Sequence, residues 1–169
     1  TATPHVREDI VRQLHLGRPT VIVTGFDRTN LTYHVRSCRT DADKDRGLVE
    51  ELAARDGLAI VYASTRKAVE RIAGMLTRQR IRALPYHAGL DDDHRREVQE
   101  AFMQEQARVI VATNAFGMGI DKPNVRLGVH HAMPGTLEAY YQEAGRAGRD
   151  GEPAECVLLH AFCDRFTHE

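Results

Sequence analysis

Two arginines stand three residues apart in the glycine-rich stretch Gln142–Gly151, QEAGRAGRDG, which we call the arginine turn. Glycine lets the backbone leave a helix and allows a ligand to approach closely. Arg146 and Arg149 could therefore project planar, permanently charged guanidinium groups into a neighbouring site. Phosphoryl transfer needs such a charge, because neutralising the γ-phosphate oxygens lowers its barrier. The alternative is that both side chains pair with local carboxylates or with the carbonyls of a helix end.

The arginine turn follows a helix-like run, and strand and helix patterns alternate through the rest of the chain. Continuous apolar runs at Leu58–Tyr62 and Val109–Ala112 are typical of parallel strands covered on both faces. Further strands are expected at Thr20–Val23, Leu31–Val35, Arg82–Tyr86, Arg126–His130 and Cys156–Leu159. Helices are expected from Pro4 to Gly17, around 48–53 and 69–76, and at 91–104 and 136–141. This alternation predicts an α/β domain with a mostly parallel sheet flanked by helices.

Ligands of such sheets gather at the carboxyl ends of the strands. Three polar or glycine-rich stretches are expected there: Ala63–Arg66, Thr113–Asp121 and the arginine turn. Hydroxyl groups and backbone amides at strand ends can hold phosphate oxygens without reading bases.

Composition narrows the class of protein. With 169 residues, 42% of them hydrophobic, the chain can bury one core, so we expect a single domain. Its net charge of −1 means that any nucleic-acid-binding face is a local patch. We expect no membrane partner and a cytoplasmic location, nucleoid-associated in a bacterium, because the sequence shows neither a long apolar run nor a signal peptide. Cys38, Cys156 and Cys163 lack metal-type spacing and are interpreted as free thiols.

The sequence has no G-x-x-x-x-G-K-[ST] phosphate loop. Gly117 and Gly119 are not followed by the lysine that such a loop requires. The stretch Asp91–His94 looks like an acidic metal-binding box, but we interpret it as the aspartate-rich start of a helix and predict no metal site. The sequence thus has arginines that could contact a phosphate group but no phosphate-binding loop. We therefore predict that the phosphate-binding loop lies outside this chain.

Two stretches resemble motifs V and VI of superfamily 2 helicases: Thr113–Arg126, with the wording FGMGIDKPNVR, and Tyr140–Gly151. Their wording is that of RecQ-family DNA helicases, and the likeness covers essentially the whole chain. It extends to Phe26–Asn30, Ile60–Arg66 and Tyr86–Leu90, and to the opening Thr1–Pro4. It implies a RecA-like three-layer domain without a phosphate loop. Residues 1–17 would be an inter-lobe helix, and 18–169 the second helicase lobe, cut from a longer chain.

The resemblance also implies roles for particular residues. Arg149 would be the arginine finger of an ATPase, Arg146 would support nucleotide contact and coupling, and Gln142 would position the site. Gly119 and Asp121 would contact the nucleotide, Asp121 at the ribose. ATP and Mg²⁺ would be held mainly by the first RecA-like lobe, so the segment alone is expected to be inactive.

On the DNA side, the resemblance implies contacts from residues in motif IV, the YHAG loop and motif V: Ser64, Thr65, Arg66, His87, Gly89, Thr113 and Arg126. His87 could instead be a hydrogen-bonded core histidine, and Arg126 could pair locally. The partner would be single-stranded and partly duplex DNA, moved 3′ to 5′. An RNA helicase lobe and a non-catalytic nucleic-acid-binding module are the alternatives. Zinc is possible in a downstream domain.

Overall fold

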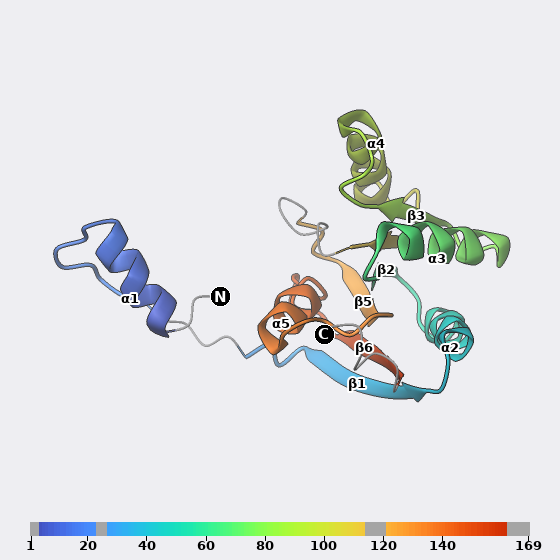
Figure 1. Cartoon of the computed structure of the whole chain (residues 1–169), viewed down its shortest axis with the longest axis horizontal. Coiled ribbons are helices and arrows are strands. Elements are labelled where there is room, and N and C mark those ends of the chain that lie inside the picture. Colours follow the sequence, from blue (N-terminus) through green and yellow to red (C-terminus); the bar gives the residue numbers. More distant parts are fainter. Residues whose placement is uncertain (1–3, 23–26, 114–120, 162–169) are drawn as a thin grey trace.

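The computed structural model describes residues 4–22, 27–113 and 121–161 (Figure 1). Its six strands form one sheet in the order β1-β6-β5-β2-β4-β3, and every neighbouring pair is parallel. The strands are β1 (Leu31–Cys38), β2 (Leu58–Tyr62), β3 (Ala83–Tyr86), β4 (Val109–Ala112), β5 (Val125–His130) and β6 (Ala154–Ala161). The helices are α1 (Pro4–Gln13), α2 (Asp41–Ala53), α3 (Arg66–Arg78), α4 (Asp92–Met103) and α5 (Leu137–Ala144). The predicted α/β class is confirmed.

The sheet is the middle of three layers. Alternate strand residues enter two hydrophobic clusters, because successive side chains of a strand point to opposite faces. One cluster joins the sheet to α2 and α3, with Leu48 and Ile72 fully buried in it. The other joins it to α4 and α5, through Phe102 and Ala144. The apolar runs of β2 and β4 are buried along their whole length, as expected for strands covered on both faces.

The strand predicted at Thr20–Val23 is wrong for the described residues Thr20–Ile22, which have no strand structure. The exposed fractions of Val21 and Ile22 are 58% and 81%. A strand needs a hydrogen-bonded neighbour, and the sheet edge is already formed by β1, which begins at Leu31. Helix α1, which lies apart from the sheet in Figure 1, begins at Pro4 as predicted but ends at Gln13, before Gly17, and buries none of its residues. The division into an inter-lobe helix and a lobe stays a prediction.

Candidate functional site

Helix α5 leads directly into the arginine turn. It begins at Thr136, whose side-chain oxygen accepts a hydrogen bond from the backbone N–H of Ala139 at 3.0 Å. It ends at Gly145, whose N–H donates to the carbonyl of Tyr141 at 2.9 Å. Gly148 then adopts a φ of +56°, in the left-handed region that favours glycine. The turn is therefore a defined structure rather than a frayed helix end.

The backbone of the arginine turn is fixed at the amino end of the sheet. The N–H of Gly148 donates to the carbonyl of Val125, the first residue of β5, at 2.8 Å. The N–H of Asp150 donates to the carbonyl of Pro123 at 3.3 Å. The expectation that this turn joins the other polar stretches at the carboxyl ends is therefore wrong. A helix that connects two parallel strands runs back against them, so its last residue lies at their amino ends.

Two of the residues expected to contact a nucleotide meet at this end. Arg149 donates from Nη1 to Oδ1 of Asp121 at 2.8 Å, and the exposed fractions of the two side chains are 34% and 80%. Such an exposed ion pair contributes about 0 to 1 kcal/mol and separates readily. Gln142 is exposed and Arg146 is half-buried, and Gly119 lies outside the described residues. The geometry offers an accessible cation on a backbone that is hydrogen-bonded to β5.

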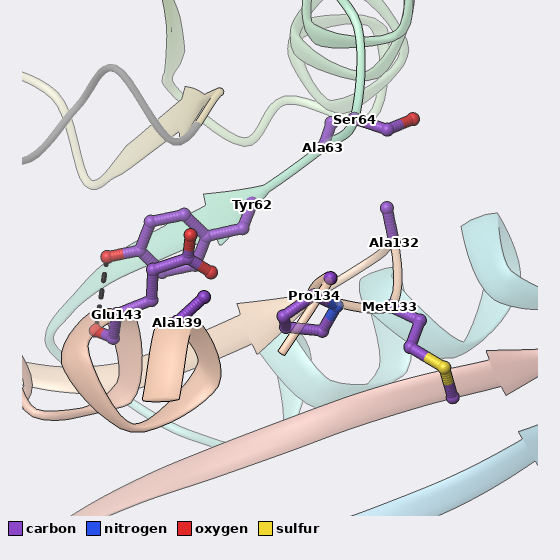
Figure 2. A pocket seen from close by; sticks show the side chains of 9 residues that line it. Tyr62, Ala63, Ser64, Ala132, Met133, Pro134, Ala139 and Glu143 are labelled. Atoms are coloured by element: carbon purple, nitrogen blue, oxygen red, sulfur yellow. Dashed lines mark hydrogen bonds between the residues drawn. The ribbon is translucent and has the colours of Figure 1, made fainter. Parts of the chain in front are cut away.

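A cluster of aromatic rings joins α5 to the sheet. The His130 ring stacks on Tyr62 with centroids 4.7 Å apart and meets Tyr140 edge-on at the same distance. Nε2 of His130 lies 2.9 Å from Oε2 of Glu143. The Tyr62 hydroxyl donates to the Glu143 carbonyl at 3.2 Å (Figure 2). Burial raises the pKa of Tyr62, against the opposing charge of Arg146, so its hydroxyl stays protonated and remains a donor.

A cavity of about 190 Å³ opens beside this cluster (Figure 2). It is lined by Tyr62 and Ser64 from β2 and the loop after it, by Pro134 from the loop after β5, and by Ala139 and Glu143 of α5. The cavity therefore borders both α5 and one residue expected to contact DNA.

The expected DNA-contacting residues, except Arg126, lie at the carboxyl ends of three neighbouring strands. Ser64, Thr65 and Arg66 follow β2, while Thr113 follows β4. Gly89 follows β3 and lies against Arg66, because a Cβ added to Gly89 would come within 2.9 Å of Arg66 Nη1. The Thr65 side chain caps α3 by accepting from the N–H of Ala68 at 3.1 Å. The structure thus brings these residues together at the carboxyl ends of the strands.

His87 holds the loop after β3 in place. It is 6% exposed, and its Nε2 lies 2.9 Å from Oε1 of Glu70. Its Nδ1 accepts from the N–H of Gly89 at 3.1 Å. Both ring nitrogens are therefore engaged within the protein, which is the geometry of the hydrogen-bonded core histidine. A direct contact between His87 and DNA stays a prediction.

Arg126 lies apart from the other expected DNA-contacting residues and pairs locally. Its Nη2 donates to both carboxylate oxygens of Asp150 at 2.6 Å, and its Nη1 donates to the carbonyl of Pro153 at 3.2 Å. These hydrogen bonds lower the pKa of Asp150 below its ordinary value. Arg126 thus supports the arginine turn from the amino end of β5, and its contact with DNA stays a prediction.

In the described ranges, no group of three or more histidine, cysteine, aspartate or glutamate side chains could hold a metal ion. Asp91 instead caps α4, accepting from the N–H of His94 at 2.8 Å. No helix within the same ranges is both long and apolar enough to cross a membrane.

Two residues near the arginine turn were given no role from the sequence. Arg28 and Asn30 donate side-chain hydrogen bonds to backbone carbonyls of the turn. The sequence feature that could have indicated a role for them is the FDRTN segment, whose polar side chains directly precede a strand.

A family model of the helicase conserved C-terminal domain matches residues 43–151, which include the arginine turn and all the expected DNA-contacting residues. The chain belongs to this family. The match covers most of α2, the helices α3 to α5 and the four strands β2 to β5, while α1, β1 and β6 lie outside it.

Relatives within the family are RecQ helicases. The chain is 50% identical over 94% of its length to the ATP-dependent DNA helicase RecQ of Bacillus subtilis. It is 44% identical over 99% of its length to the ATP-dependent helicase wrn-1 of Caenorhabditis elegans. It spans only 27% and 16% of those two proteins. The similarity to RecQ-family DNA helicases predicted from the two motifs is confirmed.

Solved structures of DEAD-box proteins share the fold. The chain is similar to Saccharomyces cerevisiae Dbp5, with a TM-score of 0.82 and 21% identity, over 99% of this chain and 44% of that one. It is also similar to a DEAD box protein from Methanococcus jannaschii, with a TM-score of 0.75 and 19% identity, over 98% and 45% of the two chains. These likenesses concern the fold alone and confirm the expected RecA-like fold.

Proposed function

We propose that this chain is the second RecA-like lobe of a RecQ-family, ATP-dependent 3′-to-5′ DNA helicase. In this proposal ATP binds between this lobe and a first RecA-like lobe, which supplies the phosphate loop and holds Mg²⁺. The partner is single-stranded and partly duplex DNA. The observation that carries the proposal is the placement of Arg149, an accessible cation on a turn whose backbone is anchored to β5.

Arg149 acts as the arginine finger. Closure of the two lobes brings its guanidinium to the γ-phosphate, where it neutralises charge that develops during transfer. The exposed pair with Asp121 opens at little cost, since such pairs contribute about 0 to 1 kcal/mol. Opening this pair also releases the Asp121 carboxylate, which can then accept hydrogen bonds from the ribose hydroxyls. Arg146 and Gln142 support the nucleotide from the same turn.

The carboxyl-end residues form part of the DNA track. Ser64, Thr65 and Arg66 are exposed at the start of α3, where backbone N–H groups favour phosphate oxygens. Arg66→Ala in the full-length protein should weaken single-stranded DNA binding uniformly across sequences. The slope of log affinity against log salt should shrink by about 0.7, because the variant neutralises one phosphate fewer. An unchanged slope would remove Arg66 from the track.

The decisive experiment is ATP turnover by the full-length protein with single-stranded DNA, comparing wild type with Arg149→Ala. Finger arginines contribute about 10³- to 10⁵-fold in turnover, so the variant should lose most activity while it binds ATP almost normally. Arg96→Ala is the matched control, because Arg96 is an exposed arginine that pairs only with Asp93 of its own helix among the contacts described. Near-normal turnover in Arg149→Ala would refute the finger assignment.

An RNA helicase lobe is the alternative, because the DEAD-box proteins share the fold. The sequence relatives favour DNA, since the DNA helicase RecQ of Bacillus subtilis is 50% identical while those DEAD-box chains are 21% and 19% identical. Comparing DNA with RNA as activators of turnover separates the two. A wild-type protein that no nucleic acid activates would favour the non-catalytic module.

A further inference from the structure

The segment before β1 contacts the arginine turn through side chains that the proposed function does not use. The Arg28 guanidinium donates from Nη1 to the carbonyl of Gly145 at 3.0 Å. Its Nη2 donates to the carbonyls of Ala147 at 3.0 Å and Gly148 at 2.7 Å. One arginine therefore binds three carbonyls of a turn that lies 117 to 120 residues away in the sequence.

Asn30 completes the contact. Its Nδ2 donates to the carbonyls of Gly148 and Glu152, each at 2.8 Å. Its Oδ1 accepts from Nε of Arg28 at 3.3 Å, which fixes the two side chains relative to each other. Its backbone carbonyl accepts from the N–H of Ala154 at 3.0 Å, where β1 and β6 begin to pair. Every polar group of the Asn30 side chain is thus engaged.

Of the carbonyls that Arg28 binds, that of Gly145 belongs to the residue that caps the end of α5, while those of Ala147 and Gly148 belong to the turn beyond it. The last carbonyls of a helix have no intrahelical donor, and a cation near them is favourable. The contact is also specific for one backbone shape, because Gly148 is left-handed and packs directly against Asn30. A Cβ added to Gly148 would lie 2.6 Å from Asn30 Nδ2 and 2.8 Å from the carbonyl oxygen of Glu152.

The bound carbonyls alternate with the residues that carry the proposed chemistry. Arg28 holds Gly145, Ala147 and Gly148, while the side chains of Arg146 and Arg149 leave the same short stretch. Fixing the carbonyls therefore fixes the two Cα–Cβ directions without touching either guanidinium. Catalytic groups lose about 100-fold in rate when they are displaced by about 1 Å.

We propose that Arg28 and Asn30 are positioning residues, a clamp that sets the direction in which the arginine turn presents Arg149. This inference rests on the proposed function of Arg149 for its effect on turnover. The clamp itself is a structural claim that can be measured without ATP.

The test uses the full-length protein and two readouts. Arg28→Ala should lower kcat for DNA-stimulated ATP hydrolysis about 10- to 100-fold, with ATP affinity changed less than about threefold. Arg28→Lys should recover part of the activity, since an ammonium keeps the charge but cannot reach three carbonyls in the same way. Hydrogen exchange of the amides of residues 146–151 should accelerate in Arg28→Ala.

Arg36→Ala is the matched control, because Arg36 is a half-buried arginine of the adjoining strand that pairs with Glu50 and Glu51 of α2. It should leave kcat and the exchange of the turn unchanged. If Arg28→Ala does not fold, Asn30→Asp tests the same clamp, because it places a carboxylate oxygen against the carbonyls of Gly148 and Glu152.

The outcomes separate the clamp from the proposed function. Unchanged exchange of the turn in Arg28→Ala overturns the clamp whatever happens to turnover. Faster exchange with wild-type kcat overturns its positioning role, provided that Arg149→Ala is inactive. Normal turnover in both Arg28→Ala and Arg149→Ala overturns the finger assignment and, with it, the catalytic consequence of the clamp. Faster exchange, a lower kcat and an intact Arg36→Ala together support it.

Discussion

The two ends of the sheet are built in different ways. At the amino end, the arginine turn is held by contacts from distant parts of the chain, including Arg28, Asn30 and the carbonyl of Val125. At the carboxyl end, the loops after β2 and β3 carry local contacts, and the loop after β5 is joined to α2 by the His131–Asp45 contact. Thr65 caps the helix that follows it, and His87 binds an amide two residues away.

This difference fits the chemistry proposed for each end. A charge that acts on a transition state must be positioned before the reaction, which requires a rigid backbone. A track that grips a moving strand needs exposed donors and no fixed partner. The clamp on the arginine turn and the local cap at Thr65 are the structural consequences. Helix α5 joins the two, since it starts after β5 and ends at the arginine turn.

Among variants that distinguish the two ends of the sheet, Gly148→Ala is expected to have the largest effect on stability. Alanine at a φ of +56° is strained, and its Cβ would overlap Asn30 and the carbonyl of Glu152. We expect a decrease of about 2 to 3 kcal/mol in the free energy of unfolding, measured by urea denaturation. Gly151→Ala is the control, because Gly151 has a φ of +86° but no atom within 4 Å of an added Cβ. Equal decreases at the two glycines would show that the close approach to Asn30 contributes nothing.

Sequence patterns predicted the elements better than their spatial arrangement. The apolar runs of β2 and β4 identified buried strands, and Thr136 was placed at the start of α5, because these signals are local. Thr20–Val23 has the composition of a strand, but no neighbouring strand pairs with its described residues. The composition of a segment does not show whether a neighbouring strand is present to pair with it.

The position of the arginine turn was predicted wrongly. The arginine turn was expected at the carboxyl ends, because glycine and arginine mark a site without saying which end a crossing helix reaches. Arg28 received no role because its partners are the backbone carbonyls of Gly145, Ala147 and Gly148. Backbone carbonyls are common to all residue types, so no side-chain pattern reveals such a clamp.

A smaller effect is expected where α5 connects the ends. His130 is fully buried and lies 2.9 Å from the Glu143 carboxylate, which is 15% exposed. His130→Phe keeps the ring packing but removes this hydrogen bond, so we expect a decrease of about 1 to 2 kcal/mol in the free energy of unfolding, measured by urea denaturation. Glu143→Gln keeps an acceptor and should cost less. Equal stability of His130→Phe and wild type would show that packing alone holds α5.

At the carboxyl end, Thr65→Ala should cost about 1 kcal/mol, because the N–H of Ala68 loses the cap of α3. Thr65→Ser should keep most of that stability in the same denaturation experiment. Hydrogen exchange at the arginine turn should be unaffected, since the cap is local. Faster exchange there in Thr65→Ala would contradict the independence of the two ends.

The smallest effect concerns pH. His131, which follows β5, is buried, and its Nε2 lies 2.9 Å from Oδ1 of Asp45. Burial lowers the pKa of His131, and the nearby charges of Lys44 and Arg71 act in the same direction against Asp45. The folded state therefore takes up this proton at lower pH than the unfolded chain. Stability from His131 is complete above about pH 6.5 and is lost as the pH falls below that value.

The amino end responds in a different range. Hydrogen bonds from Arg126 lower the pKa of Asp150, so the stability from that pair is present above about pH 4 and is lost only below it. Between pH 7 and pH 5, acidification should therefore weaken the carboxyl end and spare the arginine turn. We expect less than about 1 kcal/mol, seen as faster amide exchange around 131 and 45 with no change at 146–151. His131→Gln should remove this dependence, because the glutamine side chain does not titrate. Equal acceleration at both ends in wild type would mean that the His131 contact does not control the response.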